Sequence, residues 1–392
     1  MDYCRISKSE FPFWAMFCLF PVISIAVWQI TGNEVVNYDV FWIPFCAVLS
    51  LYGLIRKTII FKGQVKAYLI IGFLGILKYV IPWVSENISL TASLMDGKWF
   101  IYLFTAIVWL NSFGSPRMEK IYKYCIFFCF IYIAKALYMI LTGQLSRSGV
   151  LMEANYDGYM ILMVYCFSDV VKGKKWWWNA IIILTTLLTF SRTGWASFFA
   201  IMALKLFKKN ILYVILLTPI VLVLIEVGAD LRGESVQNMD RFVYWKQAII
   251  YFRETSVSNV LFGSTPGVSL KMHILPEFVW TMENFEEMKN LRGVFPFMFH
   301  STYLRLAITW GVFAALLYPA MLICKFIKSK YTPLKLLCLI TLIQSFSLSA
   351  LTLQNVSFLL FVLFISSWRY DKKIQNYRYN SISPLQRKVL TH

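Results

Sequence analysis

Twelve apolar runs along the chain constrain its fold more than any other feature. A helix needs about 20 residues to cross a hydrocarbon core, and somewhat fewer where flanking side chains snorkel to the interface. In the bilayer core, helices satisfy their own backbone hydrogen bonds. The sequence therefore predicts an all-α polytopic membrane protein, with residues 1–392 forming a single membrane domain. The predicted spans, about 12 in number, cover residues 11–30, 40–55, 67–84, 99–113, 122–142, 157–171, 176–190, 193–207, 211–228, 301–324, 333–348 and 351–368.

Composition agrees with this interpretation. Only 15% of the residues are charged and 59% are hydrophobic, whereas soluble domains carry about 25% charged residues. Two apolar stretches, 176–207 and 333–368, are each long enough to form a single helix. Such a helix would overshoot a bilayer, so we expect each stretch to contain two helices that form a hairpin.

The net charge of +18 follows from membrane orientation. Alternate loops, together with both termini, hold 24 of the 38 basic residues and five acids, whereas the other loops hold ten basic residues and fifteen acids. Cytoplasmic loops of membrane proteins carry the excess of Lys and Arg. Both termini are therefore predicted to be cytoplasmic, and the charge gives no reason to expect nucleic acid as a partner.

One loop is much longer than the others. Residues 229–300 lie on the predicted external side, and loops of this length are usually functional or structured. Within this loop, Phe242, Trp245, Ile249 and Phe252 recur at helical spacing. The pattern predicts an amphipathic helix near 241–253 that lies on the outer membrane surface.

Polar residues in or beside membrane spans are candidates for function, because burying them in lipid is costly. Arg192 lies between two short runs, which places it slightly below the outer interface in a protein-lined cavity. His300 opens the tenth span and titrates in a range suited to proton transfer. Arg305 lies further along that span, where it either lines the same cavity or pairs with an acid. The candidates on the external side are Arg147, Asn155, Ser191, Arg192, Arg241, Trp245, His300 and Arg305.

The sequence shows no clustered metal ligands on this side, no P-loop and no nucleotide-binding glycine pattern. We therefore expect no metal and no cofactor. Chemistry under these conditions needs a substrate already activated on the membrane, with arginines to hold its anionic groups.

Three stretches on the external side resemble motifs of the O-antigen polymerase and ligase family. They are Thr189–Trp195, Arg241–Trp245 followed by Leu261–Gly267, and His300–Leu304 followed by Gly311. They occur in the family's order, and Met152–Tyr156 is a weaker fourth match. The chain departs from the family pattern at three places: Ala154 replaces a proline, Ser301 replaces an asparagine, and no glycine follows two residues after Gly263.

The resemblance implies a membrane fold similar to the GT-C class of integral-membrane glycosyltransferases, in the bacterial inner membrane. It also implies transfer of an undecaprenyl-pyrophosphate-linked oligosaccharide to an acceptor sugar outside the membrane. Arg192 and Arg241 would then stabilise the pyrophosphate leaving group, and His300 would accept or position the proton of the acceptor hydroxyl. Asn155 would hydrogen-bond sugar or phosphate, and Trp245 would stack on a sugar ring or anchor the loop in membrane lipid. A chain-length regulator protein is the expected protein partner.

Three other functions compete with a polymerase of O-antigen repeat units. A ligase that attaches the finished glycan to lipid A core would share these motifs. The departures from the family pattern and the aromatic-rich character of the chain favour the polymerase. A flippase for lipid-linked oligosaccharides would need cations along a central cavity, but the candidate cations within the predicted spans are few: Lys78, Lys135, Arg305 and Lys335. A membrane protein with only a structural role is the third alternative.

Overall fold

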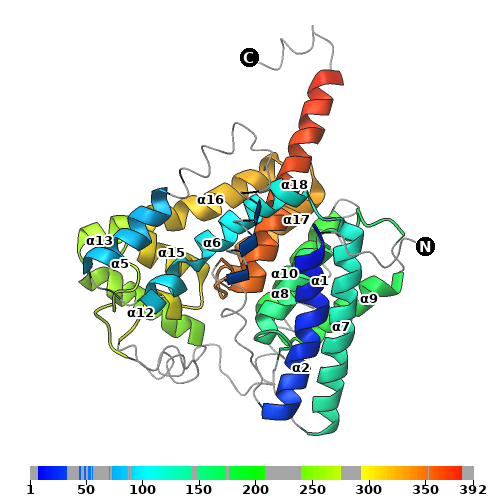
Figure 1. Ribbon diagram of the computed structural model, residues 1–392, viewed down its shortest axis with the longest axis horizontal. Helices are drawn as coiled ribbons and strands as arrows, with labels where there is room; N and C mark the ends of the chain where they lie inside the picture. Colours follow the sequence, from blue (N-terminus) through cyan, green and yellow to red (C-terminus); the bar gives the residue numbers. More distant parts are fainter. Residues whose placement is uncertain are drawn as a thin grey trace.

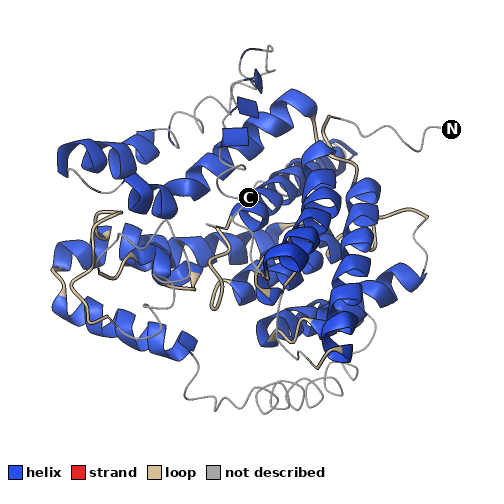
Figure 2. Ribbon diagram, turned by 60° about the horizontal axis from the view of Figure 1, so that its bottom comes forward, coloured by secondary structure: helices blue, strands red, loops and turns tan. Residues whose placement is uncertain are grey.

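In the computed structural model, the described residues form helices joined by loops and turns (Figure 2). Within these residues the only β contact is an isolated antiparallel bridge between Leu270 and Val294, so the all-α prediction is confirmed there. The described residues are 8–32, 44–45, 48–49, 52–53, 55, 70, 73–86, 88, 90–143, 149–173, 176–207, 240–274, 293–351 and 353–381.

The first half of the chain forms helices that follow the predicted spans with shifted ends. A short π-helical segment, Ala15–Leu19, joins the first two helices into one continuous rod, and a second one, Ile76–Val80, leads into α5. The helices are α1 (Phe11–Trp14), α2 (Phe20–Thr31), α5 (Ile81–Glu86), α6 (Leu90–Phe113), α7 (Met118–Leu141), α8 (Ala154–Tyr165), α9 (Trp176–Leu188) and α10 (Arg192–Phe207).

The second half begins with the long predicted external loop. Two helices lie within that loop, and a single 3₁₀ turn at Pro296–Met298 precedes the next span. The helices are α12 (Asp240–Glu254), α13 (Val257–Phe262), α15 (Thr302–Trp310), α16 (Val312–Lys328), α17 (Thr332–Gln344) and α18 (Gln354–Ser381).

Two of these segments, Phe11–Thr31 and Met118–Leu141, are long and apolar enough to cross a membrane. α16 adds a row of exposed apolar side chains, with Leu316 at 62% and Leu317 at 70% exposure, as expected of a lipid-facing helix. The number of twelve spans and their orientation stay predictions. The predicted spans 40–55, 67–84 and 211–228 lie partly or wholly outside the described residues.

Both predicted helix breaks are present. The stretch 176–207 divides into α9 and α10 at Thr189–Ser191, where Phe190 adopts a positive φ of 46°. The stretch 333–368 divides into α17 and α18. These breaks agree with the physical argument that one helix of this length would overshoot a bilayer.

One predicted span is wrong as a single helix. Residues 301–324 form α15 and α16, which meet at Gly311 with a φ of 84°. A Cβ at Gly311 would collide with the Leu261 carbonyl, and a Cβ at Gly263 would collide with the backbone of Thr309. The helix breaks there because the end of α13 approaches it backbone to backbone, a tertiary contact that periodicity does not report.

The helices form two groups around separate apolar cores (Figure 1). In Figure 1 the rod α1–α2 lies beside α7 on one side of the molecule, with α8, α9 and α10 near it. α5, α12, α13 and α15 gather on the opposite side. α18 packs along α6, and α17 packs against both α10 and α16, so these helices join the two groups.

Contacts near the helix ends join segments that are predicted to share a side of the membrane. Arg117 Nε donates to Glu10 Oε1 at 2.6 Å, and this hydrogen bond raises the pKa of the Arg117 guanidinium. Arg369 donates to Asn111 Oδ1 at 2.6 Å. All four residues lie at or near helix ends that are predicted to share the cytoplasmic side, and the orientation itself stays a prediction.

Candidate active site on the external side

The connection between α17 and α18, residues 345–353, is the point on which the predicted site segments converge. Its backbone N–H and carbonyl groups and its serine hydroxyls bond to residues from α8, α10, α12 and the start of α15. We refer to it below as the α17–α18 connection. The sequence analysis assigned no function to this connection. The available signal was the set of serines that interrupts an apolar run.

The turn that carries His300 is held on both sides by this connection. Thr302 donates its backbone N–H to Ser345 O at 3.0 Å and its hydroxyl to Leu348 O at 2.7 Å. Before the turn, Ser349 Oγ donates to Phe299 O at 3.0 Å. His300 itself is only partly buried, and its ring centroid lies 5.6 Å from that of Tyr244 in α12. The backbone of His300 is therefore fixed while its imidazole borders the loop helix.

Ser301, which replaces the family's asparagine, caps α15. Its hydroxyl accepts from Leu304 N at 3.5 Å and donates to Ser345 O at 3.0 Å. Serine is a preferred residue at this position because its oxygen satisfies a free N–H of the first turn. The substitution thus keeps a capping function at the start of the helix.

Arg192 is the first residue of α10, and its neighbours fix its position. Ser191 is fully buried, and its hydroxyl accepts from Gly194 N at 3.0 Å as an N-cap. Thr193 accepts at its carbonyl from Gln344 Nε2 at 3.0 Å and at its hydroxyl from Ser347 Oγ at 3.2 Å. Ser191 therefore acts as a cap in this structure, and Arg192 projects from a helix start that the α17–α18 connection holds.

The residues of the predicted amphipathic helix form a helix, α12, which is one residue longer at each end than the predicted range, and its place on the outer membrane surface stays a prediction. Its Tyr244, Ala248 and Tyr251 are buried in the second core, whereas Ile249 is 51% exposed. Trp245 donates from Nε1 to Phe346 O at 3.4 Å. The indole thus contacts the α17–α18 connection. Its predicted stacking on a sugar ring and its predicted anchoring in lipid both stay predictions.

Asn155 lies in the first turn of α8 and is 3% exposed. Its neighbour Tyr156 accepts from Ser349 N at 3.2 Å through its hydroxyl. The start of α8 is therefore fixed on the same connection that holds His300 and Arg192.

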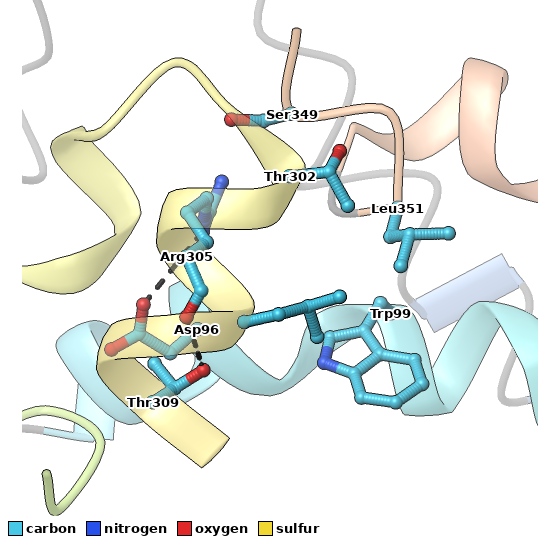
Figure 3. A pocket seen from close by; sticks show the side chains of 8 residues that line it. Asp96, Trp99, Thr302, Arg305, Thr309, Ser349 and Leu351 are labelled. Carbon is cyan, nitrogen blue, oxygen red and sulfur yellow. Dashed lines mark hydrogen bonds and ion pairs between the residues drawn. The ribbon is translucent and has the colours of Figure 1, made fainter. Parts of the chain in front are cut away.

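Arg305 pairs with an acid, which was one of the two expected outcomes. Its Nη2 lies 3.7 Å from Asp96 Oδ1 and donates to Met95 O at 3.1 Å. Figure 3 shows the two charged groups facing each other between α15 and α6. Asp96 Oδ2 also accepts from Gly267 N at 3.2 Å, which ties the glycine-containing motif to the pair.

The ion pair borders a small cavity beside the helix that His300 opens (Figure 3). Sequence analysis missed Asp96, and the signal available was a lone acid three residues before an apolar run. Together with Asp96 and Arg305, the residues that line this cavity are Trp99, Thr302, Leu306, Thr309, Ser349 and Leu351.

Two predicted site residues cannot be placed. Arg147 lies outside the described residues. Arg241 belongs to the first turn of α12, but its side chain is not among those described. In the part of the chain that is described, no group of three or more His, Cys, Asp or Glu side chains gathers as in a metal site. The chemical roles of all the candidate residues stay predictions.

Comparison with known families supports the resemblance seen in the motifs. Residues 177–318 match the model of a family described as O-antigen ligase. The matched range contains α10, α12, α13, α15 and all but the first residue of α9, and Arg192, Trp245, His300 and Arg305 lie within it. No curated protein matches the chain significantly. The match covers a little over a third of the chain, and it supports a place in the O-antigen ligase and polymerase family, whose members are membrane-associated, glycosyltransferase-like enzymes.

Proposed function

We propose that this member of the O-antigen ligase and polymerase family is a polymerase of bacterial surface polysaccharide. It would transfer a glycan from undecaprenyl pyrophosphate to an acceptor repeat unit at the external face of the inner membrane. One observation carries the proposal: the segments that contain Arg192, Trp245 and His300 all hydrogen-bond to the α17–α18 connection.

The arginines suit the donor. Arg192 and Arg241 both lie in the first turn of a helix, where the helix dipole favours negative charge. As the anomeric carbon–oxygen bond breaks, the electron pair leaves with the pyrophosphate and negative charge grows there. Preorganised cations and N–H groups stabilise such developing charge more than they stabilise the ground state. Cleavage of the bond between the sugar and the pyrophosphate supplies the driving force of the transfer, so the reaction needs neither a nucleotide nor a metal.

His300 suits the acceptor. The hydroxyl oxygen of the acceptor sugar forms the new bond to the anomeric carbon, and its proton passes to the His300 imidazole. The fixed backbone on either side of His300 supports this role, because a general base must be held within hydrogen-bond reach of the proton it removes. Asn155 and Trp245 would orient the sugars from α8 and α12.

The family description favours a ligase as the second candidate. In that case the same donor site would serve, and the acceptor would be lipid A core. A flippase has less support, because the cations within the predicted spans are already engaged. Lys78 donates to Phe262 O, Lys135 donates to Gly149 O, Arg305 faces Asp96, and Lys335 lies over the Phe326 ring.

Deletion of the gene, followed by electrophoresis of the surface glycan and of the lipid-linked pool, tests the proposal. Loss of a polymerase leaves a single repeat unit on core lipid. Loss of a ligase leaves no transferred glycan and retains lipid-linked polymer, and loss of a flippase leaves single units facing the cytoplasm. Either of the last two patterns would overturn the polymerase, and restoration of long chains by the wild-type gene is the control.

A further inference from the structure

A second cavity, with a volume of about 600 Å³, lies at the opposite ends of the helices that carry the candidate site. It is formed by the end of α8, the start of α9, the end of α10 and the start of α17. Arg192 begins α10, and Lys205, thirteen residues later, lines this cavity. At about 1.5 Å per residue, the two ends are about 20 Å apart, so the cavity is separate from the site proposed for glycan transfer.

The mouth of the cavity is cationic. Lys205 Nζ donates to Ser168 Oγ at 2.7 Å and lies 3.1 Å from Asp169 Oδ1, so this acid partly balances its charge. Lys330 is exposed, and within the described residues its ammonium has no ion-pair partner. Two more acids lie nearby: Asp371 accepts the backbone N–H of Lys330 at 2.7 Å and that of Tyr331 at 2.9 Å, and the charge of Glu119 acts on Tyr331. The side-chain charge of Lys330 is therefore left for an external anion.

The inner wall of the cavity is apolar, with Met202, Leu204, Pro333 and Leu336 among its lining residues. A cationic mouth above an apolar wall, between helices, matches the two halves of a phospholipid. A small anionic metabolite would satisfy the lysines but would leave this wall in contact with water. The combination of both surfaces therefore favours a lipid over a free phosphate.

The surrounding aromatic residues indicate that this end of the helices lies at a membrane interface. Trp176, which begins α9, is 81% exposed. The Trp368 ring lies between two lysines, with Lys325 Nζ at 4.4 Å and Lys372 Nζ at 4.7 Å from its centroid. Tryptophan and lysine gather at the headgroup level of membranes, and the charge distribution predicts the cytoplasmic leaflet for these loops.

We propose that this cavity binds one anionic phospholipid of the cytoplasmic leaflet. Its phosphate lies between Lys205 and Lys330, and an acyl chain runs along Leu204 and Leu336. The binding site goes beyond the proposed glycan transfer, which uses the other ends of the same helices.

The test uses the full-length protein, purified in detergent and exchanged into mixtures of phosphatidylglycerol and phosphatidylcholine. Native mass spectrometry then counts the lipids retained by each protein molecule. We expect the wild-type protein to retain one phosphatidylglycerol in preference to phosphatidylcholine. Lys330→Ala should retain phosphatidylglycerol about fivefold less, because a lysine near an anionic headgroup contributes about 1 kcal/mol.

Lys328→Ala is the matched control, because Lys328 is exposed two residues before Lys330 and does not line the cavity. It should retain the lipid as the wild type does. A second variant, Leu204→Trp, fills the apolar wall without changing any charge and should also reduce retention. Equal loss in Lys330→Ala and Lys328→Ala, equal retention of both lipids, or displacement of the lipid by inorganic phosphate alone would each overturn the proposal.

Discussion

Two regions of the molecule bury a carboxylate close to a basic side chain, and they use the charges differently. Between α6 and α15, Asp96 faces Arg305 at 3.7 Å on the wall of a cavity. Beside α7 and α8, Asp157 Oδ2 accepts from Val150 N at 2.6 Å and from Leu151 N at 3.2 Å.

The base of the second region also bonds to backbone. Lys135 Nζ donates to Gly149 O at 2.7 Å and lies 4.6 Å from the centre of the Trp28 ring. Acid and base thus hold one turn, residues 149–152, from its two sides. The comparison indicates that the Asp157 region serves the fold, whereas the Asp96 region keeps its charges beside α15, the helix that follows the turn of His300.

The largest effect is expected from Asp157→Ala. The change leaves the Val150 and Leu151 N–H groups buried without their acceptor and removes the negative charge that faces the Lys135 charge, and it should lower the free energy of unfolding by about 3–5 kcal/mol. Thermal unfolding of the purified protein measures it, with Asp157→Asn as the control that keeps one acceptor oxygen and should lose less. Wild-type stability in Asp157→Ala would remove the distinction between the two regions.

For His300→Ala, Arg192→Ala and Arg241→Ala we expect a loss of activity with no loss of stability, in contrast to Asp157→Ala. Each should reduce glycan transfer about 10²- to 10³-fold, because it removes a group that acts on developing charge or on the transferred proton. Long glycan chains should disappear on gels while protein level and unfolding temperature stay unchanged. Normal chain-length ladders in these variants would contradict the site assignment.

A double-mutant cycle across Asp96 and Arg305 gives a smaller effect. Asp96→Ala or Arg305→Met alone leaves one charge without its partner and should cost about 1.5–3 kcal/mol of unfolding free energy. The double variant should cost less than the sum of the two, because neither charge remains. If the free-energy losses of the two single variants add up to that of the double variant, the two residues stabilise the fold independently and are not energetically coupled.

Trp245→Phe tests the smallest contact. The substitution removes the N–H that reaches Phe346 O at 3.4 Å and keeps an aromatic ring, so we expect a loss of about 0.5–1.5 kcal/mol. Trp245→Ala, which also removes the ring, is the comparison variant. If glycan transfer falls far more than stability in both, the indole acts on substrate rather than on the α17–α18 connection.

Much of this architecture could be predicted from periodicity and charge. The helical class, the breaks within 176–207 and 333–368, and the helix near 241–253 all follow from local sequence. Arg192 and His300 were found because a charged group beside an apolar run is costly and therefore informative. These features depend on residues close together in the chain.

What could not be predicted depends on contacts between distant segments. Asp96 gains its importance from Arg305, which lies more than two hundred residues later in the chain. The serines of the α17–α18 connection bond to α8, α10, α16 and the turn before α15, and nothing in their own sequence indicates those partners. The break at Gly311 likewise requires α13 to arrive against it.

The close backbone contact at Gly263 and Gly311 also limits which substitutions this sequence can accumulate during evolution. Both residues have positive φ, and at each a side chain would strike the main chain of the facing segment. Neither position can accept a side chain while the two segments stay in contact, because the clash at each is with the main chain of the facing segment. The long loop can change around them in length and composition, but any descendant with this packing inherits both glycines.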